Sequence, residues 1–306
     1  MKAGLTIIFA FLFGFCCAQA PIQIKSFEDH RPLPYASVAN LTKRQLHFTD
    51  ENGIVSANFD INDSIFISYV GYQNLKSRIE ATGSQIFFLN QSNYVLEAVK
   101  IAKCRNVIKH EYSNLASGKK FGGVGWNKNA MNAKVAIMLK LESDDFILNS
   151  FSIWLRRDNG VPRHAIQAPM IFSFFSIDDS SMLPGELISN QRVVYHPKKE
   201  GKQTIQIDSL HLRIPRSGIY VSIEYVFDDK YQYPMHYIEK GIKILGTGYG
   251  GHIDGVLAKG NFTLAFYHYA RDRWSFPLHR DESWLSEVHG TIKFSAELTS
   301  CKDENE

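Results

Sequence analysis

The chain has 306 residues, of which 44% are hydrophobic and 21% are charged. This balance is typical of a folded globular protein and argues against intrinsic disorder. The formal net charge of +3 is too small to indicate the concentrated basic surface that nucleic-acid binding needs. The length allows two ordinary domains or one large sandwich.

The first residues have the pattern of a secretory signal peptide. Lys2 supplies a positive charge, and residues 5–15 form an uninterrupted apolar run. This run is too short for a permanent membrane span. We expect a signal peptide over residues 1–18 with cleavage after Ala18, whereas the alternative is a buried amino-terminal helix. The predicted location is the periplasm, the outer membrane or the medium, and no later apolar run predicts a transmembrane segment.

Removal of the signal peptide leaves two cysteines, Cys104 and Cys301. In an oxidising compartment they can form a disulfide that closes nearly the whole second half of the chain. The alternative is two independent thiols, because spacing in sequence does not give the distance in space. Two cysteines at this separation do not make a zinc site by themselves.

Residues 19–101 read as short strands separated by turns. Val55 and Ala57 alternate with polar residues, as expected of a half-buried strand. Asn52 and Gly53 supply the positive-φ chemistry of a tight turn. Since no helical period extends over a useful length, we predict a small all-β sandwich.

Residues 102–133 are rich in lysine and glycine and contain few acidic residues. Such a composition is typical of a solvated linker between domains. The alternative function is a basic contact patch for lipid or glycan. The basic residues concerned are Lys103, Arg105, Lys109, Lys119, Lys120 and Lys128.

A second series of strands is predicted over residues 134–298. Many short segments of alternating hydrophobicity follow one another at regular spacing, without intervening helices. We predict a larger, jelly-roll-like β-sandwich, followed by an acidic tail over residues 299–306. The alternating positions include Val135, Ile137, Leu139, Phe151, Ile153, Leu155, Ile219, Val221, Ile223 and Tyr225.

Four pieces of the first segment carry a resemblance. They are residues 32–38 (PLPYASV), 49–53 (TDENG), 68–72 (SYVGY) and 96–99 (LEAV). In this order they resemble the carboxypeptidase-regulatory-like domain, a transthyretin-type sandwich of seven strands that is common in envelope proteins of Bacteroidetes. The resemblance implies no peptidase activity.

The resemblance also bears on the biological setting. In large receptors of the TonB-dependent class this domain precedes a plug and a barrel, which residues 102–306 do not predict. Residues 134–228 are instead similar to the C-terminal half of stand-alone envelope proteins in the same bacteria. Those relatives have no established reaction, so the resemblance gives a class of protein and no activity.

The sequence offers little catalytic chemistry. No H-E-x-x-H motif, G-x-S-x-G elbow or P-loop occurs. His252 and Asp254, in the glycine-rich segment 248–255, come closest to a pair of metal ligands, but a third ligand cannot be named. The simpler interpretation is a flexible loop. We therefore predict no catalytic residue, no metal and no cofactor.

An aromatic and basic segment at residues 267–289 is the best binding candidate. Flat aromatic faces beside charged groups suit sugar rings, peptides or another protein. The alternative is that these aromatic residues cover an open end of the sandwich, with arginines packed on them. The candidate ligand-binding residues are Tyr267, Tyr269, Arg273, Trp274, His279 and Trp284.

Three functions follow as hypotheses. The first is a non-catalytic exported envelope protein that acts as a binding or assembly module for a glycan, peptide or protein. The second is a structural accessory of a TonB-dependent uptake system. The third is a metal-assisted hydrolase around His252 and Asp254.

Overall fold

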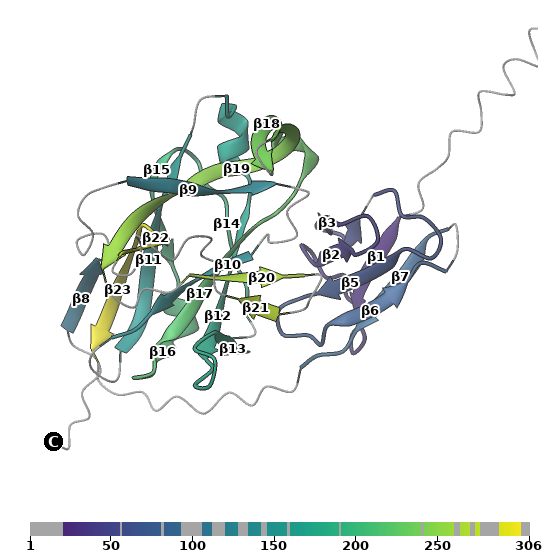
Figure 1. Cartoon of the computed structure of the whole chain (residues 1–306). Coiled ribbons are helices and arrows are strands. Elements are labelled where there is room, and N and C mark those ends of the chain that lie inside the picture. The colour runs from purple at the N-terminus through teal and green to yellow at the C-terminus, as the bar shows by residue number, and fades with distance from the viewer. Residues whose placement is uncertain are drawn as a thin grey trace, which may run out of the picture.

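The computed structural model describes residues 21–55, 57–80, 83–92, 106–111, 120–127, 134–141, 146–157, 160–189, 191–239, 242–259, 264–269, 273–275 and 288–300. The predicted signal peptide, Cys104, Cys301, His279, Trp284 and most of the predicted acidic tail lie outside these ranges. The fold class predicted from the sequence is confirmed, because the described chain is all-β. A seven-stranded sandwich is followed by a larger jelly-roll-like one (Figure 1).

The N-terminal sandwich consists of a three-stranded and a four-stranded sheet. Apolar side chains at alternate positions of its strands, such as Ile22 and Ile24, point into its core. The smaller sheet has the order β4-β1-β7, and its strands are β1 (Ile22–Ser26), β4 (Ile54–Val55) and β7 (Gln85–Leu89). The larger sheet has the order β3-β2-β5-β6, and its strands are β2 (Ser37–Asn40), β3 (Gln45–Phe48), β5 (Ser64–Ser68) and β6 (Leu75–Arg78).

Two of the pieces that carry the resemblance meet at one buried threonine. The Thr49 hydroxyl donates to the carbonyl of Leu33 at 2.7 Å and accepts from the amide of Ala36 at 2.8 Å. The Asp50 carboxylate accepts the amides of Asn52 and Ile54, which closes the turn that follows. Side chains therefore satisfy the backbone groups that the irregular segment 32–36 leaves without a strand partner.

The first sheet of the C-terminal sandwich has seven strands in the order β13-β12-β17-β10-β20-β21, with β14 paired to β12. All of their pairings are antiparallel. The strands are β10 (Lys134–Leu139), β12 (Met170–Ile177), β13 (Pro184–Leu187), β14 (Val193–Tyr195), β17 (Ile219–Tyr225), β20 (Leu264–His268) and β21 (Arg273–Ser275).

The second sheet has nine strands, with β18-β19-β11-β23-β8 as its main path. The strands are β8 (Asn106–Glu111), β9 (Lys120–Asn127), β11 (Phe146–Arg156), β15 (Gly201–Gln206), β16 (Leu212–Ile214), β18 (Gln232–Glu239), β19 (Ile242–Lys259), β22 (Val288–Ile292) and β23 (Phe294–Ser300). Short 3-10 turns occur at η2 (Arg163–Gln167), η3 (Asp208–Leu210) and η4 (Asp229–Tyr231).

Aromatic rings hold these two sheets together. Phe151 of β11 stacks on Phe294 at 5.7 Å between centroids and meets Phe172 and Phe174 of β12 edge-on at 4.9 and 6.2 Å. All four side chains are fully buried. Rings in offset and edge-to-face geometry contribute beyond their buried area, so this cluster fixes the distance between the sheets.

The segment predicted as a linker, residues 102–133, contains two strands. β8 pairs with β23, and β9 pairs with β19. The sequence obscured both strands because lysines and glycines dilute the apolar residues of each, such as Val107 and Trp126. The register of β8 places Asn106 opposite Ser300. These two residues are the described residues nearest in sequence to Cys104 and Cys301.

The glycine-rich segment predicted as a flexible loop lies in β19, the longest strand described. Tyrosine rings from the paired strand β18 and from β17 of the other sheet fill the space that side chains at two glycines of β19 would occupy. A Cβ atom at Gly250, which has φ +69°, would overlap the ring of Tyr225, and one at Gly248 would approach the ring of Tyr233 to 2.7 Å. The glycines serve close packing here, which the sequence alone did not distinguish from flexibility.

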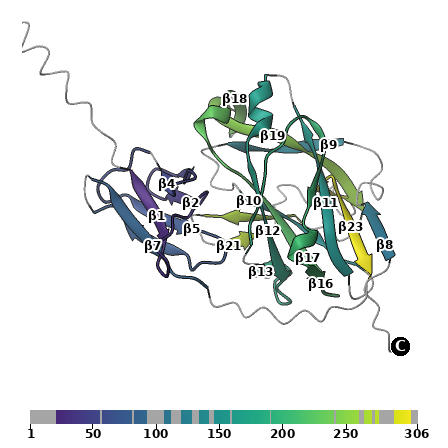
Figure 2. The same ribbon diagram turned by 180° about the vertical axis from the view of Figure 1, so that it is seen from behind.

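Among the residues that the structure covers, no helix has the length and apolar character needed to cross a membrane. The two sandwiches lie side by side, and β20 and β21 are on the side of the C-terminal sandwich that faces the N-terminal one (Figures 1 and 2).

Substitution of Gly250 by alanine tests the packing of β19. The added methyl group meets the ring of Tyr225 and forces a positive φ on an L-residue, so we expect a loss of about 3 kcal/mol in the free energy of unfolding. The control is Gly160→Ala, which has φ +92° and no atom within 4 Å of the added carbon. Urea unfolding of both variants should show a cost of only about 1–2 kcal/mol for the control. Equal costs would contradict the packing argument.

Candidate functional site

The two sandwiches share one hydrophobic core along their contact, which we call the seam. Phe48 of β3 packs edge-on against Phe227 at 5.6 Å between centroids, and Phe66 of β5 meets Tyr269 at 6.4 Å. Phe66 and Tyr269 are fully buried and Phe48 and Phe227 nearly so. Apolar burial therefore joins the sandwiches, and any pocket in the seam has fixed walls on both sides.

A buried polar network lies inside the seam. Glu224 of β17 accepts hydrogen bonds from the hydroxyls of Tyr269 and of Ser37, which belongs to the N-terminal sandwich. Its second oxygen lies 3.8 Å from the ammonium group of Lys134. The side chains of Lys134 and Glu224 are only 9% and 3% exposed, so this is a buried ion pair with hydrogen bonds from both sandwiches.

Strand register explains how this pair forms. Lys134 of β10 lies directly opposite Glu224 on one side and opposite Tyr267 of β20 on the other. Cross-strand partners on one face of a sheet are in contact distance, so the three side chains form a row. The ammonium group lies 5.3 and 5.8 Å from the ring centroids of Tyr267 and Tyr269. Burial lowers the pKa of Lys134, and the attraction of Glu224 opposes that shift only in part.

The structure places four of the six predicted binding residues. Tyr269 is fully buried in the seam, and Tyr267 is nearly so. Trp274 of β21 is half-buried, with its ring 5.2 Å from that of Tyr267, and Arg273 is exposed. His279 and Trp284 lie outside the described residues. The ligand-binding role of this set stays a prediction.

Two of these rings line a small pocket. It has a volume of about 210 Å³ and lies between the segment from Tyr69 to Tyr72 and the rings of Tyr267 and Trp274. Gly71, with φ +82°, lets the chain turn there, and the rings of Tyr69 and Tyr72 meet at 5.3 Å. The Tyr-Val-Gly-Tyr piece of the first sandwich and the aromatic segment of the second therefore face each other across the seam.

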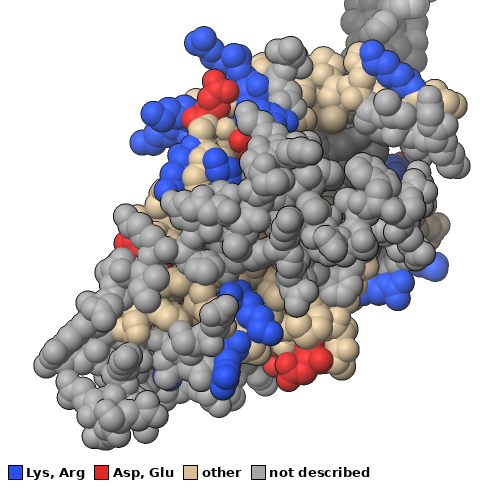
Figure 3. All heavy atoms as spheres, turned by 60° about the vertical axis from the view of Figure 1, so that its left-hand side comes forward, with Lys and Arg blue, Asp and Glu red and all other residues tan. Residues whose placement is uncertain are grey.

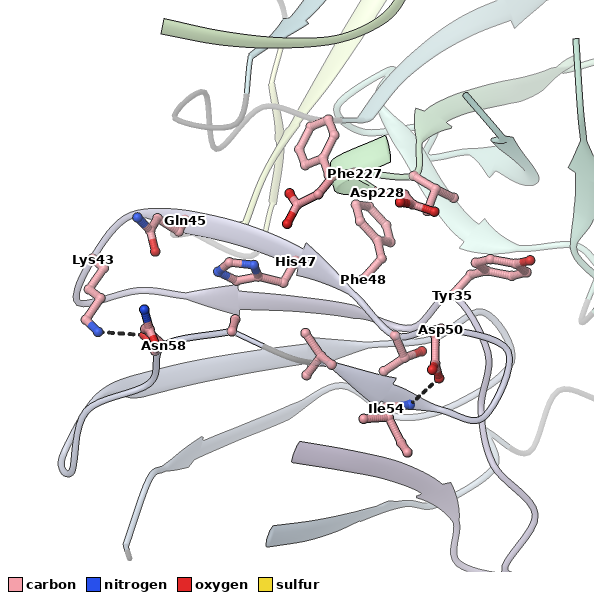
Figure 4. A pocket seen from close by; sticks show the side chains of 15 residues that line it. Tyr35, Lys43, Gln45, His47, Phe48, Asp50, Ile54, Asn58, Phe227 and Asp228 are labelled. Carbon is pink, nitrogen blue, oxygen red and sulfur yellow. Dashed lines mark hydrogen bonds between the residues drawn. The ribbon is translucent and has the colours of Figure 1, made fainter. Parts of the chain in front are cut away.

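A larger pocket of about 600 Å³ opens elsewhere in the seam (Figure 4). Along one wall are Lys43, Gln45 and His47, from β3 and the turn before it. Opposite them are Phe227 and Asp228, which precede η4. Apolar side chains such as Phe48, Val55 and Phe227 line the pocket together with polar ones. The size and mixture of groups are typical of sites for small ligands.

Acidic residues outnumber basic ones among the residues that line this pocket. Asp50, Asp228 and Asp229 are among the residues that line it, while its cation, Lys43, is engaged at 3.0 and 3.4 Å by acidic side chains outside it. The pocket therefore has an excess of negative charge, and neutral hydrogen-bonding side chains such as that of Gln45 also line it. An arrangement of this kind favours neutral, hydroxyl-rich ligands and disfavours anions.

The pair His252 and Asp254 lies elsewhere, on β19. The Asp254 carboxylate forms an ion pair with Arg156 of β11 at 3.1 Å, and His252 is the strand partner of the same arginine. Within the described ranges no three His, Cys, Asp or Glu side chains gather as metal ligands would. The ion pair accounts for Asp254 as a contact between neighbouring strands.

Basic side chains also lie on the outer surface. On the face drawn in Figure 3 the described lysines and arginines lie in separate groups, and acidic side chains adjoin the group at the upper left. This face has no single basic patch among the residues drawn in colour, in keeping with the small net charge.

Sequence reasoning missed most residues of the seam. Glu224 and Lys134 carried a usable signal, because a charged residue within a strongly apolar strand must find a partner if it is buried. His47, Phe48 and Phe227 carried none. They become neighbours only because two separately formed sandwiches pack together.

Comparison with known proteins does not identify a family for this chain. No family model matches the chain, and no curated protein is significantly similar to it. Among solved structures, the chain is weakly similar to infectious bursal disease virus Gx strain, with 11% identity and a TM-score of 0.19 over 93% of the chain. The chain is also weakly similar to the VP2 subviral particle of infectious bursal disease virus, with 11% identity and a TM-score of 0.19 over 90% of the chain. The chain spans only 65% and 63% of those two chains, and similarity this low supports no functional argument.

The buried pair can be tested by a double-mutant cycle. Lys134→Met leaves the carboxylate of Glu224 buried without its cation, and we expect a loss of about 3–5 kcal/mol in the free energy of unfolding. Adding Glu224→Gln removes the uncompensated charge and should recover most of that loss. Urea unfolding of both single variants and the double variant measures the coupling. Strict additivity would show that the two groups do not interact.

The same pair predicts a pH dependence. Because the pKa of Lys134 is lowered in the folded protein from its ordinary 10.5, the unfolded chain binds more protons in the window just below pH 10.5. Stability therefore rises with pH in that window. The double variant Lys134→Met/Glu224→Gln should lack this contribution. Unfolding curves from neutral pH to 10.5 test the difference, and parallel profiles would contradict the lowered pKa.

Proposed function

We propose that this protein is a non-catalytic, exported binding module that holds a neutral glycan in the larger seam pocket. The observation that carries the proposal is that pocket itself, about 600 Å³ in volume and bounded by both sandwiches. It combines aromatic residues with carboxylates and amides. Such groups bind sugars because the hydroxyls of a sugar need hydrogen-bond partners while its apolar faces contact rings.

The charge of the pocket supports a neutral ligand over an acidic one. Three carboxylates line it, and its lysine is already paired with Asp60 and Asp63. An anionic ligand would bring like charges together at a cost of several kcal/mol. Asp228 also caps η4 and pairs with Lys230 at 2.9 Å, and the carboxylate of Asp50 accepts two backbone amides.

Sequence features support the cellular setting. The signal-peptide pattern over residues 1–18 is typical of exported proteins. The resemblance of residues 19–101 to the carboxypeptidase-regulatory-like domain favours the bacterial envelope. We propose envelope location on these two grounds, and a role without catalysis because the sequence contains no recognised catalytic motif.

A glycan array tests the proposal. The full mature chain should bind neutral oligosaccharides in preference to acidic ones. His47→Ala and Asn58→Ala each remove one polar contact from the pocket wall and should weaken binding about tenfold. The matched control is His236→Ala, an exposed histidine on β18 that lines none of the pockets described here.

Two results would count against the proposal. One is an array on which no neutral glycan binds. The other is equal binding by His47→Ala and the wild-type chain, which would place the ligand away from the pocket. Capture of peptides without glycans would instead favour an assembly role.

A further inference from the structure

A third pocket in the seam has the opposite charge to the larger one. Its volume is about 360 Å³, and Arg31 and Arg192 are its charged residues, with no Asp or Glu among the residues described as lining it. Tyr35 lines both this pocket and the larger acidic one. Two cavities of the same seam are thus separated by one tyrosine and differ in the sign of their charges.

Arg192 is the most unusual group in this pocket. Its guanidinium lies on the ring of Tyr69, 4.5 Å from the centroid, and its Nη1 donates to the carbonyl of Pro34 at 3.4 Å. Its Nε is shielded from solvent and has no hydrogen-bond partner in the described part of the chain. A shielded guanidinium donor without a partner is costly, and a bound oxyanion would remove that cost.

The charges inside the seam do not balance, with Lys134 and Glu224 buried and Arg192 partly buried. Lys134 and Arg192 are positive, and Glu224 is the one buried acid that acts on both of them. Burial lowers the pKa of Arg192, and Glu224 opposes this shift only in part. Two cations against one anion leave one positive charge that the described residues do not neutralise.

Arg31 and Tyr72 complete the pocket. Arg31 pairs through Nε with Asp29, outside the pocket, at 3.1 Å, and its Nη2 donates to the hydroxyl of Tyr72 at 3.4 Å. The side-chain amide of Gln91 donates to the same oxygen at 3.4 Å. Burial alone would raise the pKa of Tyr72, but hydrogen bonds, that from Arg31 foremost, outweigh it and lower the pKa. The bonds from Arg31 and Gln91 hold this hydroxyl in the wall of the pocket.

We propose that this pocket binds an oxyanion, held by the guanidinium groups of Arg31 and Arg192 and by the hydroxyl of Tyr72. Guanidinium groups recognise carboxylates and tetrahedral oxyanions through paired N–H donors. The volume suits a group no larger than a single acidic sugar or amino acid. The site is distinct from the proposed glycan pocket and does not depend on it.

Isothermal titration calorimetry with glucuronate, glucose and inorganic sulfate tests the proposal on the full mature chain. Glucuronate should bind and glucose, its neutral counterpart, should not. Sulfate binding without glucuronate binding would assign a tetrahedral oxyanion and support the site equally. Overturning results are affinities for glucuronate and sulfate that do not exceed the affinity for glucose.

Variants locate the binding. Arg192→Met and Arg31→Met should each weaken oxyanion binding about tenfold or more, and Tyr72→Phe should weaken it less. Arg163→Met removes an exposed arginine of η2 and should leave binding unchanged. If Arg192→Met does not fold, the binding measured for Arg31→Met decides whether the oxyanion binds in this pocket, because Arg31 is exposed. Equal losses in Arg31→Met and Arg163→Met would show binding to diffuse surface charge and overturn the proposal.

Discussion

The constraint on which the seam depends is the burial of Glu224. A carboxylate in this position requires hydrogen bonds and a cation, and it obtains them from Tyr269, Ser37 and Lys134. One of these donors belongs to the other sandwich. The geometry that satisfies Glu224 is therefore also the geometry that sets the two sandwiches against each other, while the apolar contacts of Phe48 and Phe66 supply the main driving force.

This fixed seam has functional consequences. Cavities between domains change shape when the domains move, but here the walls are held by a shared core and by polar contacts of defined direction. The acidic pocket around Asp50 and the basic pocket around Arg192 are kept apart. If both proposed sites bind as we infer, the seam discriminates between ligands by charge, because each pocket repels the ions that the other attracts.

The segment from Tyr69 to Tyr72 links the resemblance to the seam. Gly71 in this segment has a positive φ, which a kink between two tyrosines requires and glycine adopts without strain. Its tyrosines face both the small pocket beside Trp274 and the basic pocket beside Arg192. The aromatic segment of the C-terminal sandwich contributes Tyr267 and Trp274 to one of these cavities, although Tyr269 is enclosed entirely.

The sequence by itself determined the all-β class and the smaller and larger sandwiches, because period-two hydrophobicity and glycine or asparagine turns act over a few residues. The count of seven strands for the smaller sandwich came from the resemblance. Such local signals failed where glycines and lysines interrupt a strand, as in β8, β9 and β19. Only the tertiary structure decided the pockets. Arg31 and Arg192, or His47 and Phe227, lie far apart in the chain, and no local pattern records a neighbour that packing of two sandwiches brings into contact.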